Sequence, residues 1–213
     1  LNGLFLNFYK DEIFGVATDG HRLAKAGVEF SNNVDEPINA IVPRKGVIEI
    51  DKQLEEEDQD IKIIISKNHM QVTSNFSEAV TKLIDGKFPD YERVIPSSPD
   101  KLINVECKVF KEALMRVSIL SNDRFRGVRL NFLENEIKVS ANNPEKEEAS
   151  DDIKSQYIGE PLEVGFNVNY LIDVLNTIKT KNVQIALKDA NSSALITPEN
   201  DSTASYVIMP LRL

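Results

Sequence analysis

The sequence predicts an α+β protein built from two copies of one domain, in which helices pack on antiparallel sheets. Segments of the first half of the chain recur in the second half at a constant spacing. Each half also contains alternating apolar residues, typical of strands, followed by apolar residues at helical spacing. The repeat is too long for one unit of a solenoid, so each copy is expected to form a domain.

The repeat is clearest where residues 2–20, NGLFLNFYKDEIFGVATDG, are compared with residues 126–144, RGVRLNFLENEIKVSANNP. Gly3 corresponds to Gly127, which sets an offset of 124 residues (127 − 3). The same offset aligns VPRKGVIEI at 42–50 with FNVNYLIDV at 166–174. Further on, IKIII (61–65) resembles VQIAL (183–187), and VIP (94–96) resembles IMP (208–210). The two copies therefore present the same elements in the same order.

Each copy is expected to open its repeated part with a β-hairpin. In the first copy Leu4, Leu6 and Phe8 alternate with other residues, a turn falls at 10–11, and a second strand begins near Ile13. A helix and three short strands follow in each copy.

Two helices are predicted in the second copy. One of them follows Asn167, which is a suitable N-cap. Its apolar face consists of Val168, Leu171, Ile172, Leu175 and Ile178. The other lies in an opening segment, residues 101–126, and its apolar face consists of Val109, Phe110, Ala113, Leu114 and Val117.

The first copy has no counterpart of that opening segment, because the offset places it before Leu1. We therefore expect two domains, residues 1–100 and 101–213, the first lacking its N-terminal strand and helix. The first domain is expected to expose part of its core where these elements are missing.

The composition excludes several classes of protein. Among 213 residues the formal net charge is −9, which argues against a protein that binds nucleic acid over its whole surface. No apolar run approaches the roughly 18 residues of a membrane span. The single cysteine, Cys107, permits neither an internal disulfide nor a cysteine-based metal site, and a reducing cytoplasm is the expected compartment.

Seven ordered motifs together resemble one family. They are ATDGHRLA (17–24), IVPRKGVIE (41–49), DGKFPDYERVIP (85–96), LSNDRFRGVRL (120–130), ANNPEKEEA (141–149), GFNVNYLIDVLN (165–176) and YVIMPLRL (206–213). They resemble the bacterial DNA polymerase III beta subunit family, the replication sliding clamps, from Leu1 to Leu213. The resemblance implies a three-domain subunit that dimerises head to tail into a ring around duplex DNA. This chain would hold most of the second clamp domain and all of the third.

The resemblance also implies a function. The protein would be a non-catalytic processivity factor without a cofactor or metal, located in the cytoplasm. It would encircle double-stranded DNA without sequence preference. It would also tether the replicative polymerase, the clamp loader and other proteins that carry a clamp-binding motif. The full-length protein would be a homodimer and this chain alone a monomer.

Three sets of residues correspond to family sites. The partner-peptide cleft would comprise Leu1, Thr18, Gly20, His21, Arg22, Leu23, Pro89, Arg93, Val94, Asn167, Tyr170, Asn191, Ser193, Val207, Ile208, Met209, Pro210, Leu211 and Arg212. Asn191 stands where an apolar residue is common in the family. The DNA-facing cations would be Arg44, Lys45, Lys52, Lys108, Lys111 and Arg116. The subunit interface would include Ile119, Leu120, Glu145, Glu147 and Glu148.

Other interpretations of these residues remain open. The cations can belong to solvated helix faces, the acidic run to a solvated loop, and residues 206–210 to a closing core strand. The chain could also be a peptide-binding adaptor that does not encircle DNA. A hydrolase centred on Asp19 and His21 is disfavoured, because no G-x-S-x-G motif or cysteine nucleophile accompanies them.

Overall fold

The computed structural model describes residues 2–30, 34, 36–54, 60–122 and 126–212. The chain divides into two compact units, each described by itself below. The first contains Leu1–Gly20 and Ala24–Tyr91, and the second contains His21–Leu23 and Glu92–Leu213.

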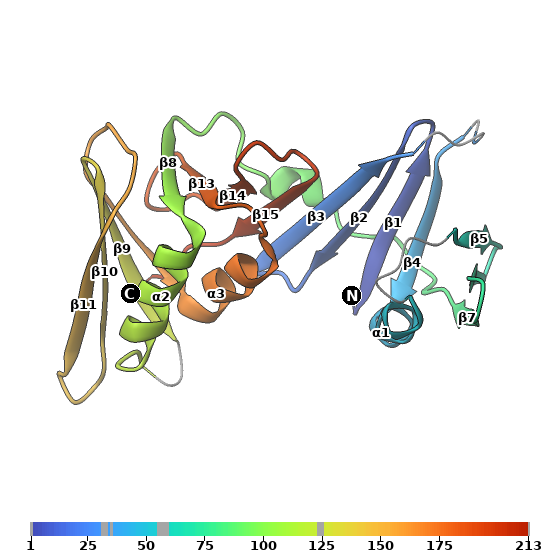
Figure 1. The fold of residues 1–213 in the computed structure, drawn as a ribbon, viewed down its shortest axis with the longest axis horizontal. Helices are drawn as coiled ribbons and strands as arrows, with labels where there is room; N and C mark the ends of the chain where they lie inside the picture. Colours follow the sequence, from blue (N-terminus) through green and yellow to red (C-terminus); the bar gives the residue numbers. More distant parts are fainter. Residues whose placement is uncertain (1, 31–33, 35, 55–59, 123–125, 213) are drawn as a thin grey trace. The chain divides into compact units, whose positions relative to one another are not determined.

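The first unit carries two small antiparallel sheets and one helix (Figure 1). One sheet has the order β4-β1-β2-β3, with β1 Gly3–Tyr9, β2 Glu12–Thr18, β3 Arg22–Glu29 and β4 Ile38–Pro43. The other has the order β5-β6-β7, with β5 Lys62–Ile65, β6 His69–Thr73 and β7 Glu78–Lys82. The helix α1, Arg44–Gln53, packs against β1, β4 and β7. The predicted hairpin turn is confirmed, since Lys10 has a positive φ of 49° between paired Tyr9 and Glu12.

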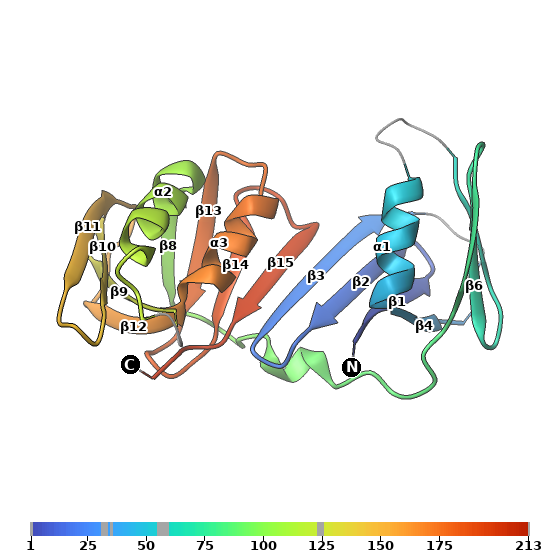
Figure 2. The ribbon, with the colours of Figure 1, turned by 90° about the horizontal axis from the view of Figure 1, so that it is seen from below.

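The second unit has two four-stranded sheets and two helices. One sheet has the order β11-β10-β9-β12, with β9 Gly127–Leu133, β10 Glu136–Asn142, β11 Glu148–Lys154 and β12 Leu162–Asn167. The other has the order β8-β13-β14-β15, with β8 Lys101–Glu106, β13 Asn182–Leu187, β14 Ala194–Pro198 and β15 Ala204–Ile208. The helices α2, Cys107–Ser118, and α3, Val168–Thr177, lie side by side and pack on each other (Figure 2). A short 3-10 helix, Tyr91–Val94, precedes β8.

The strand orders confirm the predicted fold class and the duplication. Reversing the first sheet of the first unit gives β3-β2-β1-β4, which corresponds strand for strand to β11-β10-β9-β12. Likewise β5-β6-β7 corresponds to β13-β14-β15, and α1 corresponds to α3. Only β8 and α2 have no counterpart in the described part of the first unit.

The helices of the second unit bury the faces that the sequence predicts, with one correction. In α2, Phe110, Ala113 and Leu114 are fully buried. Val109 is 36% exposed, so its assignment to the apolar face was wrong: it lies one residue, about 100° of helix, before Phe110. The predicted N-cap of α3 is confirmed, because Asn167 Oδ1 accepts a hydrogen bond from the Asn169 backbone at 2.9 Å.

Positions of β2 in the first unit are less buried than the equivalent positions of β10 in the second unit. Ile137 and Ala141 of β10 are 0% and 5% exposed, and α2 packs against β9, β10 and β11. Their counterparts in β2, Ile13 and Ala17, are half-buried and exposed, respectively. The difference follows from the absence of an α2 equivalent over this face in the described residues.

Candidate functional site

The apolar C-terminal segment is first a strand of the core and then an exposed arm. Val207 and Ile208 end β15 and are 1% and 0% exposed. Because neighbouring residues of a strand point to opposite faces, β15 is buried on both sides here. Met209, the next residue, is 37% exposed, and Arg212 is exposed.

Two backbone hydrogen bonds fix the course of this arm. The Met209 N–H donates to the carbonyl of His21 at 3.0 Å, and the Leu211 N–H donates to the carbonyl of Gly165 at 2.7 Å. The first bond joins the arm to the start of β3, and the second joins it to β12. The structure thus brings Met209 and His21, which are far apart in sequence, to one place in the second unit.

Arg22 forms a cluster with two residues of α3. Its guanidinium lies 4.4 Å from the centre of the Tyr170 ring and makes an ion pair with Asp173 at 2.6 Å. An arginine over a tyrosine face is attracted by the ring quadrupole, so this contact favours one orientation of the half-buried Tyr170 ring. Asp173 was not predicted from the sequence, although it follows Tyr170 by three residues and therefore lies on the same face of the helix.

The second unit also supplies the described lining of a pocket of about 400 Å³. It contains four predicted cleft residues, Arg93, Val94, Asn191 and Ser193. It also contains residues that the sequence did not single out: Ile95, Pro96, Ser97, Lys188 and Ser192. Three of these nine described lining residues are apolar and six are polar or charged.

The remaining predicted cleft residues belong to both units. Thr18 and Gly20 form a tight turn in the first unit, where the Gly20 N–H donates to Thr18 Oγ1 at 3.1 Å and Gly20 adopts a φ of 89°. A side chain would strain this backbone. Pro89 is exposed in the same unit, and Leu23 is buried in the second. Leu1 lies outside the described residues.

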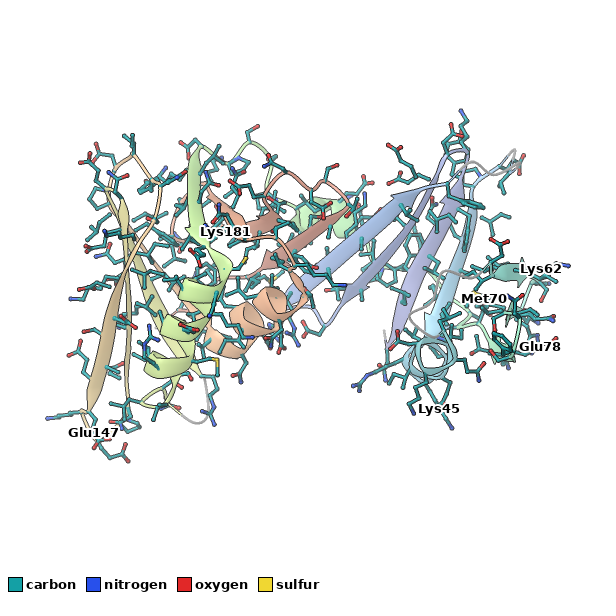
Figure 3. All side chains as sticks on the ribbon, viewed as in Figure 1. Lys45, Lys62, Met70, Glu78, Glu147 and Lys181 are labelled. Carbon is teal, nitrogen blue, oxygen red and sulfur yellow. The ribbon has the colours of Figure 1, made fainter. Side chains whose placement is uncertain are left out.

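The predicted DNA-facing cations differ in their surroundings. Arg44 and Lys45 are exposed in the first turn of α1, which contains no acidic residue. Figure 3 labels Lys45. Arg116 pairs with Asp151 at 2.7 Å, so a neighbouring carboxylate offsets its charge. Carboxylates also lie near Lys52, whose partner Glu49 is at 3.3 Å, and near Lys108, whose partner Glu112 is at 4.0 Å. Lys111 is half-buried.

The predicted subunit-interface residues form two groups in the second unit, one after α2 and one around the β10–β11 turn. Ile119 follows α2 and is 79% exposed, the next residue Leu120 being half-buried. Glu145 and Glu147 lie in the β10–β11 turn, where Figure 3 labels Glu147, and Glu148 is the first residue of β11. The Glu147 side chain accepts a bond from Asn143 Nδ2 at 2.6 Å, and its N–H donates to Asn143 Oδ1 at 2.9 Å.

Groups that often support chemistry are sparse in the part of the chain that the structure describes. No three His, Cys, Asp or Glu side chains there are grouped so that they could hold a metal ion. Burial raises the pKa of the Cys107 thiol, which reduces its thiolate fraction. None of the described helices is long and apolar enough to cross a membrane.

Comparison with known proteins defines the class. Two family models match almost the whole chain: the central domain of the DNA polymerase III beta subunit over residues 1–90, and its C-terminal domain over residues 92–212. The two units are therefore adjacent domains of the clamp type. The chain belongs to the DNA polymerase III beta subunit family.

Individual relatives agree with this assignment. The chain is 42% identical to the beta sliding clamp of Pseudomonas putida and 43% identical to that of Escherichia coli K12, each over 213 residues. A solved sliding clamp from Pseudomonas aeruginosa, described as a structure with ligand, superposes with a TM-score of 0.97 at 42% identity and 100% coverage of this chain. Another from the same organism, bound to griselimycin, gives the same TM-score and identity. The chain spans 58% of the length of both curated relatives and 57–58% of these two structures.

Proposed function

We propose that the chain is the peptide-binding part of a sliding clamp, a non-catalytic processivity factor that encircles duplex DNA and tethers the replicative polymerase. The observation that carries this proposal is the match of both units, in order, to consecutive domains of one clamp subunit. The clamp loader and other proteins with a clamp-binding motif would use the same cleft. Replication places this activity in the cytoplasm.

A ring explains how an acidic protein can stay on DNA. Non-specific electrostatic binding has Kd values of about 10⁻⁴ to 10⁻⁶ M at physiological salt, too weak to retain a polymerase through long synthesis. A closed ring cannot leave sideways, and weak phosphate contacts let it slide. Arg44 and Lys45 suit such contacts, because neither makes an ion pair within the described residues. Lys111 adds a third such cation, whereas Arg116, Lys52 and Lys108 would exchange their carboxylate neighbours for phosphates.

The second unit supplies the chemistry of peptide recognition. Apolar side chains come from Val94 and the arm at 209–211, and polar groups from Asn191 and Ser193 can fix a peptide backbone. Met209 is exposed and flexible, so it can adapt to different ligands. The ligand-bound and griselimycin-bound clamps of Pseudomonas aeruginosa are consistent with a binding surface on this fold.

Calorimetric titration with a peptide containing Gln-Leu-Ser-Leu-Phe tests the peptide-binding role. We expect a Kd of about 1 μM, or roughly −8 kcal/mol, and a loss of at least about tenfold in Tyr170→Ala, because the ring is a wall of the site. Asn176→Ala, an exposed change on the same helix, is the matched control and should bind normally. No binding by the unsubstituted chain would contradict the proposal.

A second candidate is a peptide-binding adaptor that does not encircle DNA. It is favoured by one observation: the described lining of the 400 Å³ pocket comes entirely from the second unit, so peptide binding there does not require a ring. Retention of the full-length protein on circular DNA, but not on linear DNA, distinguishes the clamp from the adaptor.

A further inference from the structure

The pocket at Arg93–Ser97 has a charge that contrasts with the rest of the protein. Its lining includes two cations, Arg93 and Lys188, and no carboxylate among the described residues. The chain as a whole carries a net charge of −9. A cationic pocket on an acidic protein is an electrostatic feature that can select a ligand.

A hydrogen bond to another residue is the main cause that lowers the pKa of Asp189 and of Asp100, and the charge of Lys188 lowers both further. Asp189 Oδ1 accepts the Asn191 N–H at 2.8 Å, a bond within the same turn that lowers the pKa of this carboxyl. Asp100 pairs with Lys101 at 3.0 Å. Lys188 makes no ion pair within 4.0 Å among the described residues, although its backbone carbonyl accepts a bond from Lys101.

The rest of the pocket lining mixes apolar and polar residues. Val94, Ile95 and Pro96 line the pocket together with the polar side chains of Asn191, Ser192 and Ser193. The best complement to this lining is an apolar side chain with a carboxylate beside it. A pocket of about 400 Å³ accommodates one or two residues of a peptide and excludes a DNA duplex.

We infer that Lys188, with Arg93, binds a carboxylate that follows the apolar anchor of the partner segment. The site would thus prefer segments in which the motif precedes an acidic residue or the free C-terminus of the chain. This inference rests on the proposed function, since it concerns the partner that the same cleft binds.

Fluorescence anisotropy with three labelled peptides tests it. Each contains Gln-Leu-Ser-Leu-Phe-Gly, followed by Asn with an amidated end, Asp with an amidated end, or Asn with a free carboxylate. We expect one or both of the acidic peptides to bind roughly two- to five-fold more tightly than the neutral one at low salt. A gain with Asp assigns the side chain as the source of the carboxylate, and a gain with the free end alone assigns the terminus.

Lys188→Gln should reduce this ratio to about one. Lys179→Gln, an exposed change of the same charge outside the pocket lining, is the control and should preserve the ratio. Equal binding of all three peptides, or a ratio unchanged in Lys188→Gln, would overturn the inference while leaving the proposed function intact. Failure of all three peptides to bind would contradict both.

Discussion

At the scale of single residues, the position of a charged side chain depends on neighbours that are distant in sequence. Arg22 is separated from Asp173 by 151 positions, yet their ion pair places the guanidinium over Tyr170. Exposed ion pairs contribute little to stability, so we expect this one to act mainly by orienting the ring.

Asp173→Asn tests this positioning role. We expect the free energy of unfolding to fall by less than about 1 kcal/mol, since the two side chains are 34% and 57% exposed. Peptide affinity should fall several-fold, because Arg22 no longer holds Tyr170. Glu163→Gln, which breaks the exposed pair with Arg129, is the control and should leave peptide affinity unchanged. Equal peptide affinity in both variants would contradict the role of Asp173.

Cys107 is expected to react slowly with thiol reagents in the folded protein. Burial raises its pKa, so less thiolate is present at any pH below that value than for an exposed thiol. The rate of labelling by an aromatic disulfide reagent at pH 8 should be much lower in buffer than in denaturant. Equal rates in the two conditions would show that the thiol is accessible in the native state.

At the scale of elements, one face of α2 is buried in the core of the second unit. Leu114 is 0% exposed and its neighbour Met115 is 51% exposed. Leu114→Ala should lower the free energy of unfolding by about 2–5 kcal/mol, whereas Met115→Ala should change it by less than about 1 kcal/mol. Urea unfolding followed by circular dichroism measures both, and similar losses would show that α2 does not pack as described.

Much of the arrangement of helices and strands could be predicted from the sequence. Apolar spacing identified the hairpin, α2 and α3, and the constant offset identified the duplication, because these signals are local or repeat along the chain. Val109 was assigned wrongly because an apolar residue at the margin of a helical face has the same spacing signal as a buried one.

The contacts of the candidate site were much less predictable. The bond between Met209 and His21, the pairing of Arg116 with Asp151, and the presence of Lys188 in a pocket with Arg93 all depend on tertiary packing. A resemblance to a family identifies residues that correspond to family positions. It does not show which of their charges are offset by neighbouring residues. The assignment of the cleft, DNA-facing and interface residues therefore stays a prediction for experiment.

At the scale of the whole molecule, we expect peptide binding to be separable from ring formation. The 213-residue chain spans 58% of its curated relatives, and ring closure in the proposed assembly pairs the third domain with a first domain outside this sequence. Light scattering should therefore show mainly a monomer. Binding to linear and circular duplex should be equally weak and should fall steeply with salt. Salt-resistant retention on circular DNA alone would contradict this.

Deleting Met209–Leu213 tests whether the C-terminal arm is a wall of a peptide cleft. The deletion removes two backbone hydrogen bonds, each contributing about 1 kcal/mol, but leaves the buried end of β15 at Val207 and Ile208. Calorimetric titration of the Gln-Leu-Ser-Leu-Phe peptide, with circular dichroism of the same sample, should show lost binding and a retained fold. Undiminished binding would contradict this role, and unfolding would show that the segment serves the core instead.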